Sequence, residues 1–301
     1  MPTTLNDAHC HFLSTPFFAS LGGDTALAKL GWEAPGTAEA LADCWMAELD
    51  RHQVSRAALI ASVPGDAASV AAAVNRHRER FVGFFMVDPT QPDAAAKASE
   101  AIAHGGLRAI CLFPAMHRYS IQDDRATRLF DVAAATPGTA VFVHCGVLSV
   151  GVRKKLGLPS PFDIRFGNPL DLHAIALSHP LVPIIIPHFG AGLFREALMV
   201  ADLCPNVLLD TSSSNSWIKY VGLTLPAVFR QALAVVGPDR LLFGTDSSFF
   251  PRGWVGDVYE QQSSALDEIG ASTEVREKIF GGNFERVFPA AGDNGGYGGN
   301  G

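Results

Sequence analysis

The sequence predicts an α/β fold, a (β/α)8 TIM-type barrel with closing helices at the C-terminal end of the domain. Short apolar segments rich in Val, Ile, Leu and Phe recur along the chain, and Gly, Pro or Asp residues bound each of them. Within each segment the apolar residues follow one another without alternating polar residues, which is typical of strands buried on both faces of a parallel sheet. Helical patterns separate them, and eight such units fill a length on the order of 250 residues, as a TIM barrel needs. A doubly wound open sheet is the alternative, and the absence of GxGxxG after the first strand disfavours its dinucleotide-binding form.

The strands are expected at regular intervals from the start of the chain. The first contains the segment DAHCHF, residues 7–12. Seven more are expected at residues 55–63, 81–89, 107–114, 139–146, 182–190, 206–213 and 240–249. This order of short apolar segments predicts that each strand pairs in parallel with the next one along the chain.

Helices are expected between these strands. The patterns lie at residues 37–53, 66–81, 92–106, 123–138, 168–180, 193–204 and 225–238. Thr37 is a good N-cap for the first of them, and the glycines that end 92–106 are typical of a helix C-terminus. Residues 273–288 predict one or two closing helices. We therefore expect one domain over residues 1–290, followed by a flexible glycine-rich tail at 291–301.

The composition excludes several classes of protein. The chain has 301 residues, 48% of them hydrophobic, and a net charge of -7, which disfavours a nucleic-acid or anionic-membrane partner. No apolar run approaches the roughly 20 residues of a membrane span, and the N-terminus lacks a secretory signal pattern. The five cysteines are scattered without a CxxC motif, as in proteins with reduced thiols. We expect a cytoplasmic protein.

Polar residues end several of the predicted strands. His9 and His11 lie two positions apart and so share a face of the first strand. His144 ends the fifth strand, His188 the sixth and Asp246 the eighth. A lone histidine at such a place is more often a hydrogen-bonded core residue. Five polar groups that converge on the mouth of one barrel, where barrel enzymes have their active sites, instead indicate a metal site.

The ordered set of motifs resembles the amidohydrolase superfamily, in particular the amidohydrolase-2 branch that includes aminocarboxymuconate semialdehyde decarboxylase. The segments that carry the resemblance are DAHCHF, VFVHCG, IIIPHFGAG, NVLLDTSS, RLLFGTDSSF and GGNFERVF. The resemblance implies that His9, His11, His144 and Asp246 bind a metal ion. It also implies that His188 and Asp246 are catalytic, and that the protein is a homodimer.

The resemblance further implies a single metal ion. Binuclear members of the superfamily carry a carboxylated lysine at the end of the fourth strand, and here that strand reads AICLFPAM. Zn²⁺ suits a site rich in nitrogen ligands with one carboxylate, and Mn²⁺ is the alternative.

The loops after the strands suggest a small-molecule substrate. Phe12 and Trp217 are expected to line an apolar pocket for a ring-bearing compound. Among the cations at this end, Arg252 is favoured to bind a substrate carboxylate, ahead of Arg118 and residues 153–155. Such aromatics and cations also occur as ordinary loop packing and surface pairs.

Three functions remain open from the sequence. The first is a metal-dependent hydrolase of a small carboxylated ester, lactone or amide. The second is a metal-dependent, non-oxidative decarboxylase of an aromatic or muconate-type acid. The third is a barrel that binds a metabolite without turnover, which the complete set of expected ligands disfavours.

Overall fold

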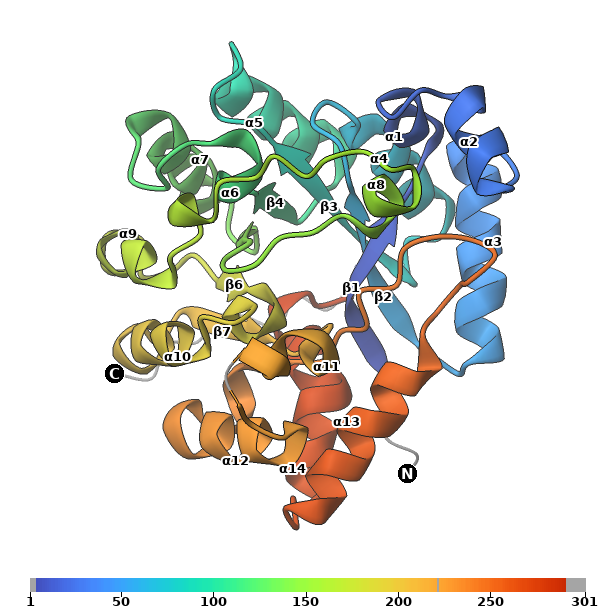
Figure 1. Cartoon of the computed structure of the whole chain (residues 1–301). Coiled ribbons are helices and arrows are strands. Elements are labelled where there is room, and N and C mark those ends of the chain that lie inside the picture. The colour runs from blue at the N-terminus through green and yellow to red at the C-terminus, as the bar shows by residue number, and fades with distance from the viewer. Residues whose placement is uncertain (1–3, 221, 291–301) are drawn as a thin grey trace.

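The computed structural model describes residues 4–220 and 222–290, which form one sheet of eight parallel strands surrounded by helices (Figure 1). The strands pair in chain order, from the first to the eighth. They are β1 (Asn6–Phe12), β2 (Arg56–Ala61), β3 (Phe81–Val87), β4 (Ala109–Leu112), β5 (Ala140–Val143), β6 (Ile184–Ile186), β7 (Val207–Asp210) and β8 (Leu241–Leu242).

The sheet closes into a barrel between β1 and the segment that follows β8. The N–H of Ala8 donates to the carbonyl of Phe243 at 2.8 Å, and the N–H of His11 donates to the carbonyl of Ser247 at 2.6 Å. Cys10 and Ser247 also form a parallel bridge. The predicted (β/α)8 barrel is thereby confirmed.

Helices follow the strands and cover the outside of the sheet (Figure 1). They are α1 (Thr15–Ala19), α2 (Asp24–Leu30), α3 (Ala38–Arg51), α4 (Ala67–Arg76), α5 (Ala94–Gly105), α6 (Pro114–His117), α7 (Asp124–Ala135), α8 (Gly151–Lys155), α9 (His173–Ser178), α10 (Phe194–Leu203), α11 (Ser214–Trp217), α12 (Leu225–Val236), α13 (Gly256–Glu268), α14 (Thr273–Glu277) and α15 (Asn283–Val287). Thr37 caps α3 as expected, since its side chain accepts from the N–H of Ala40 at 3.2 Å.

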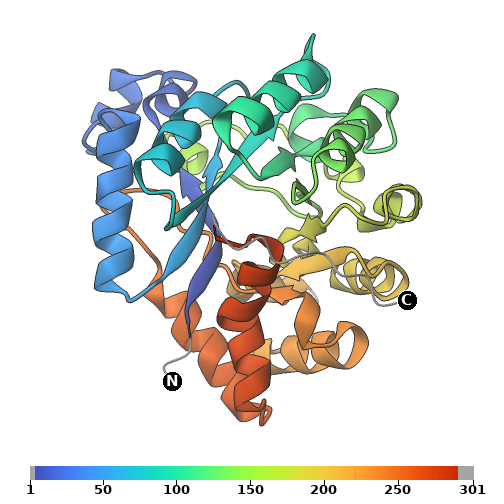
Figure 2. The same ribbon diagram turned by 180° about the vertical axis from the view of Figure 1, so that it is seen from behind.

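Two hydrophobic clusters occupy the two sides of the sheet. The larger one joins outward-facing strand residues to the helices, for example Phe12 with Trp45 of α3. The smaller one fills the barrel and includes Phe84 and Phe142. Phe288 and residues of α15 complete the inner cluster, so the C-terminal segment closes one end of the barrel, the end that faces the viewer in Figure 2. The candidate site lies at the opposite end of the barrel, at the carboxyl ends of the strands.

The structure corrects the boundaries of several predicted elements. The eighth strand is only two residues long, because the chain after Leu242 continues as an irregular segment along β1. Helix α13 has no counterpart among the predicted helices, since its sequence is largely polar and its apolar pattern is weak. The predicted tail at 291–301 lies outside the described residues, so the domain division stays a prediction.

No helix in the described parts of the chain is both long and apolar enough to cross a membrane.

Candidate metal centre

β1 directs two histidines into the mouth of the barrel. The pairing of β1 with β2 shifts register between Asp7 and Cys10, and beyond this irregularity the chain alternates normally. The ring of His9 packs edge-on against Phe142 of the inner cluster, with ring centroids 5.1 Å apart. The Nε2 atoms of His9 and His11 lie 3.3 Å apart. The two imidazoles therefore converge, as the spacing in DAHCHF predicts.

Asp246 is the third member of this group, and it comes from the segment after β8 that pairs with β1. Its Oδ1 lies 3.2 Å from Nε2 of His11 and 3.7 Å from Nε2 of His9. Its backbone is held in the left-handed region at φ 59°, where its N–H donates to the carbonyl of His9 at 2.9 Å. Such a conformation is rare for a residue with a side chain, and strain of this kind gathers at functional sites.

Hydrogen bonds fix the tautomers of both histidines. Nδ1 of His9 donates to Oδ2 of Asp210, at the end of β7, over 2.6 Å. Nδ1 of His11 lies 2.7 Å from the hydroxyl of Ser62, which itself donates to the carbonyl of Ile60 and therefore accepts from His11. Assigned in this way, each neutral ring carries its proton on Nδ1 and a lone pair on Nε2.

The three converging atoms fit a metal ion. Two Nε2 lone pairs and a carboxylate oxygen face one another across 3.2 to 3.7 Å, and no proton is available between the two rings. Such a cluster is electrostatically unfavourable unless a cation lies between its members. Tetrahedral ligands held at about 2.0–2.1 Å from Zn²⁺ lie about 3.4 Å from each other, which is close to the edges of this triangle.

His144 and His188 lie beside this group but outside it. The ligand atoms of His9, His11 and Asp246 all lie within 4.8 Å of one another, and His144 is not one of that set. The ring of His188 stacks on His9 with centroids 4.9 Å apart, and the ring of His144 meets His188 edge-on at 5.2 Å. Nδ1 of His144 is buried and has no hydrogen-bond partner among the described residues, so this ring beside the group keeps an unsatisfied nitrogen.

A left-handed turn at the end of β6 holds His188 in place. His188, Phe189, Gly190 and Ala191 all have positive φ, at 56°, 50°, 81° and 43°. Nδ1 of His188 donates to the carbonyl of Ser212 at 3.0 Å, which leaves its Nε2 as an acceptor. Three non-glycine residues in this region cost about 1–3 kcal/mol each, so the surrounding structure must enforce the turn.

The charges of the site favour metal binding near neutral pH. Burial and the neighbouring His188 lower the pKa of His144 well below its usual range, and burial also lowers the pKa of His188. Burial alone would raise the pKa of Asp246, but the adjacent ring of His11 and the other nearby histidines hold it below its usual range. The carboxylate is therefore ionised while His144 and His188 stay neutral, which is the state in which all three accept.

A cavity of about 460 Å³ opens over these residues. His11, His144, His188 and Asp246 form its polar floor. Its walls are mostly apolar, with the side chains Leu13, Phe17, Met86, Phe113, Met116, Leu148, Val150, Val152 and Phe249. A cavity of this size and lining suits a small, partly apolar molecule.

Two positively charged residues lie at the rim of this cavity, which is called the metal cavity below because it opens over the metal-binding residues. Arg252 stacks over the ring of Phe249 at 5.2 Å, and its Nη2 donates to the carbonyl of Asp246 at 3.3 Å. Lys155, in the last turn of α8, also lines the cavity. Of the cations weighed from the sequence, these two reach the site, whereas Arg118 donates to the carbonyl of Pro161.

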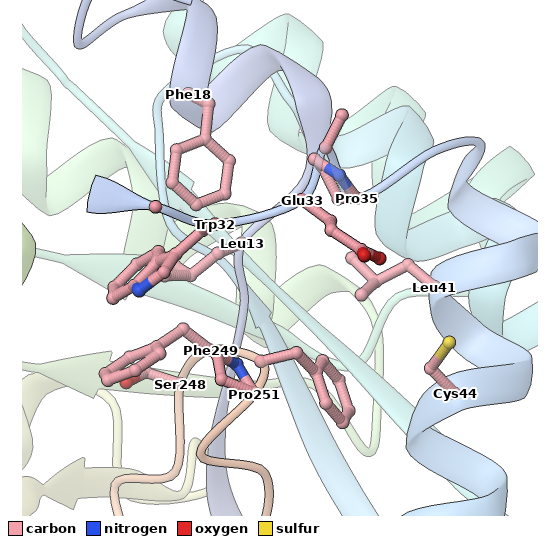
Figure 3. Close-up of a pocket in the computed structure, with 13 residues that line it drawn as sticks. Leu13, Phe18, Trp32, Glu33, Pro35, Leu41, Cys44, Ser248, Phe249 and Pro251 are labelled. Carbon is pink, nitrogen blue, oxygen red and sulfur yellow. The ribbon is translucent and has the colours of Figure 1, made fainter. Parts of the chain in front are cut away.

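A second apolar cavity, of about 410 Å³, adjoins the first (Figure 3). The two share Leu13, Ser248 and Phe249. Figure 3 shows the rings of Trp32 and Phe249 lying face to face at this boundary, and their centroids are 4.2 Å apart. The loop after β1 and the loop after β8 thus form an aromatic wall of this second cavity, and Phe249 lines the first cavity as well.

Of the two aromatic residues predicted to contact the substrate, Trp217 lines the site and Phe12 does not. Trp217 is 3% exposed and lines a smaller extension of the site together with His188 and Asp246. Phe12 does not reach the site. It is fully buried in the outer cluster, because strand alternation points it away from the face that carries His11.

Asp210 is the important residue that sequence reasoning missed. It ends β7 within the motif NVLLDTSS, so a carboxylate at a strand end was the available signal. Its contact with His9 joins residues from opposite parts of the chain. Burial would raise the pKa of Asp210, but His9 lowers it, so the carboxylate stays ionised beside the metal-facing ring.

Two imidazoles and a carboxylate converge at the carboxyl ends of the strands of a parallel barrel. This arrangement is typical of barrel enzymes that bind a metal ion. The comparison with known families supplies the particular family. The model of the amidohydrolase family Amidohydro_2 matches residues 7–290, so the chain belongs to this family and is an enzyme of the amidohydrolase superfamily.

Solved structures of related proteins share the fold over nearly their whole length. The 5-carboxyvanillate decarboxylase LigW2 from Novosphingobium aromaticivorans, solved with manganese, superposes with a TM-score of 0.61 at 15% identity and covers 95% of this chain and 96% of its own. An amidohydrolase from Burkholderia multivorans, solved with zinc, gives 0.60 at 16% identity over 96% and 100%. A protein from Pseudomonas putida that has been assigned as a 2-pyrone-4,6-dicarboxylic acid hydrolase gives a TM-score of 0.61 at 18% identity and covers 96% of this chain and 98% of its own.

Among curated proteins, the chain resembles part of the protein fluG of Emericella nidulans. The two are 29% identical over 103 residues, which is 34% of this chain and 11% of that protein. The match therefore concerns a fragment of a much longer protein and carries no whole-protein function.

Proposed function

We propose that the protein is a metal-dependent hydrolase that cleaves an ester, lactone or amide bond in a small carboxylated compound. The observation that carries this proposal is the triangle formed by Nε2 of His9, Nε2 of His11 and Oδ1 of Asp246, with edges of 3.3, 3.2 and 3.7 Å. A single divalent cation fits this donor set, with Zn²⁺ preferred over Mn²⁺ because two of the three ligands are nitrogens.

His9, His11 and Asp246 would hold this cation, with His144 as the additional ligand. A divalent cation at such a place lowers the pKa of a bound water to about 7 and polarises a substrate carbonyl oxygen. Asp210 and Ser62 keep the two strand-1 imidazoles in the tautomer that presents Nε2.

Proton transfer is assigned to His188 and Asp246. The Nδ1–H of His188 is bound to the carbonyl of Ser212, so its Nε2 is free to take up a proton and return it to the leaving group. The carboxylate of Asp246 accepts a proton from the attacking water. Arg252 and Lys155 hold a carboxylate of the substrate at the rim, while the apolar walls exclude bulk water.

A non-oxidative decarboxylase is the second candidate. The apolar walls of the metal cavity favour it, because Phe113, Met86 and Met116 would desolvate a carboxylate, and desolvation assists the loss of carbon dioxide. The similarity to a carboxyvanillate decarboxylase supports it to the same degree as the similarity to a pyrone dicarboxylate hydrolase supports the first.

Elemental analysis and isotope labelling test these proposals. About one Zn²⁺ or Mn²⁺ per chain is expected in the gently purified protein, and its loss is expected in a His9→Ala/His11→Ala double variant. The metal-loaded enzyme is then screened against carboxylated esters, lactones, amides and aromatic acids in ¹⁸O-labelled water. Incorporation of ¹⁸O into product supports the hydrolase, and release of carbon dioxide without incorporation supports the decarboxylase. Wild-type protein that binds no metal after supplementation would overturn both.

A further inference from the structure

The second apolar cavity, of about 410 Å³, has no part in the proposed chemistry. The residues assigned above to metal binding and proton transfer do not line it. It lies between the loop after β1, helix α3 and the loop after β8 (Figure 3). Leu13, Ser248 and Phe249 line both this cavity and the metal cavity, so one molecule that extends past them can occupy both.

The walls of this second cavity are built largely of rings, and we call it the aromatic cavity after its residues Phe18, Trp32, Phe249 and Phe250. Trp32 lies face to face with Phe249 and meets Phe18 edge-on, with centroids 4.2 and 6.3 Å apart. The ring of Phe250 meets the buried Trp45 of α3 edge-on at 5.2 Å. These contacts hold the rings in place, so the walls are formed before any ligand arrives.

The two cavities differ in charge. Arg252 and Lys155 give the rim of the metal cavity a positive charge. Among the described residues that line the aromatic cavity, Glu33 is the one charged side chain. Because its carboxylate repels an anion, a negatively charged group is favoured in the metal cavity and an uncharged group in the aromatic cavity.

The aromatic cavity is large enough for a whole ring, since a dry apolar cavity of about 150 Å³ already holds benzene. We propose that it binds an uncharged ring group of the substrate, while a carboxylate of the same molecule lies at Arg252 in the metal cavity. The substrate is then a molecule of two parts, and the apolar part lies outside the space that holds the reacting bond. This inference rests on the proposed function, because it places the reacting part at the metal centre.

Cys44 lines the aromatic cavity and gives a direct measure of its occupancy (Figure 3). Its thiol is exposed and the other four cysteines are buried, so iodoacetamide should alkylate Cys44 alone in the folded chain. The rate of alkylation is measured by mass spectrometry on the gently purified full chain, with and without a probe. The probes are phenylhexanol, which is uncharged, and phenylhexanoate, which carries a carboxylate on the same ring and chain.

Both probes are expected to slow alkylation by about fivefold or more at saturation, because a ring in the cavity covers the thiol. Half-maximal protection by phenylhexanoate is expected at about a tenfold lower concentration, since its carboxylate also binds Arg252 and the two contacts belong to one molecule. Arg252→Gln should remove this advantage and leave the protection by phenylhexanol in place.

Two variants of Trp32 test the wall of the cavity. Trp32→Ala should weaken the protection by both probes, because it removes a ring from the wall, and Trp32→Phe should restore most of it. Leu177→Ala is the control, because it removes an apolar side chain from an exposed position on α9 that does not line the cavity. It should be protected like the wild type.

Three results would overturn the proposal. The first is no protection of the wild type by phenylhexanol, or equal protection in Trp32→Ala. The second is equal affinity for the two probes, which would remove the carboxylate from Arg252. The third is alkylation that slows as the protein concentration rises without a probe, because a second copy of the chain would then cover the cavity. Each differs from a failure of the proposed function, since metal content and ¹⁸O incorporation are measured separately.

Discussion

Asp210 accepts a short hydrogen bond from His9 at the metal centre, with Oδ2 of Asp210 2.6 Å from Nδ1 of His9. Asp210 is fully buried at the end of β7, and His9 is 1% exposed on β1. Burial would lower the pKa of His9, but the adjacent carboxylate raises it above its usual range. The carboxylate therefore makes the ring more basic and fixes its orientation, so that the donor atom Nε2 faces His11 and Asp246.

Asp210→Asn should weaken metal binding by about 10- to 100-fold, as is typical when the partner of a ligating histidine is changed. The amide keeps the shape of the side chain but removes the charge that raises the basicity of His9. Competition titration with a chelator measures the affinity. Asp202→Asn, at an exposed position on α10, is the control and should bind metal like the wild type. Equal affinity in Asp210→Asn would contradict the role of this residue.

Gly244→Ala should disrupt the contact between His9 and Asp210 by steric overlap. A Cβ atom at residue 244 would lie 2.8 Å from Cβ of His9 and 2.9 Å from Oδ1 of Asp210, so both side chains would have to move. We expect metal occupancy to fall sharply in protein that still folds. Gly282→Ala is the control, because its nearest neighbour would be 3.5 Å away and its φ is not positive. Metal analysis and circular dichroism of both variants check this prediction, and full occupancy in Gly244→Ala would refute it.

Two substitutions at Asp246 should separate chemistry from backbone strain. Asp246→Asn is expected to lose turnover by several orders of magnitude while retaining the stability of the wild type, because Asn tolerates the left-handed φ of 59°. Asp246→Ala is expected to lose the same activity and also about 1 kcal/mol of stability, since alanine is strained in this conformation. Thermal unfolding and turnover of a product-forming substrate measure both quantities. Activity like that of the wild type in Asp246→Asn would remove this residue from the site.

The fold and much of the site could be predicted because both follow local rules. Parallel strands that pair in chain order bring their carboxyl ends to one edge, so His9 and His11 of β1 could be placed together with Asp246, which follows β8. The same rule applied to Asp210, but its role depends on a contact with His9 across the barrel, and no local pattern reports that distance.

Other features depend on packing between distant loops. Trp32, in the loop after β1, stacks on Phe249, in the loop after β8, with ring centroids 4.2 Å apart. The sequence of neither loop indicates that the two loops are in contact. Phe12 looked like a loop aromatic because it follows the HxH motif closely, yet β1 continues through it and turns it outward. Helix α13 was missed because its surface is mostly polar, which leaves little apolar periodicity to detect.

The neutral histidines predict how stability changes with pH. In the unfolded chain His144 has the ordinary pKa of about 6.5, whereas burial and His188 lower its pKa in the folded protein. As the pH falls through about 6.5, the unfolded chain therefore binds a proton that the folded chain does not bind. The free energy of unfolding of the chelator-treated protein should fall on acidification by at most about 1.4 kcal/mol per pH unit for this group.

His144→Asn should flatten this dependence below pH 6.5, and denaturant titrations at a series of pH values measure it. The raised pKa of His9 acts in the opposite sense, because a group that binds protons more tightly when folded adds stability at low pH. The comparison therefore has to be made between variants and not from the wild type alone. His104→Asn, which removes an exposed histidine from α5, is the control and should keep the slope of the wild type. Equal slopes in His144→Asn and the wild type would show that His144 is not held neutral in the fold.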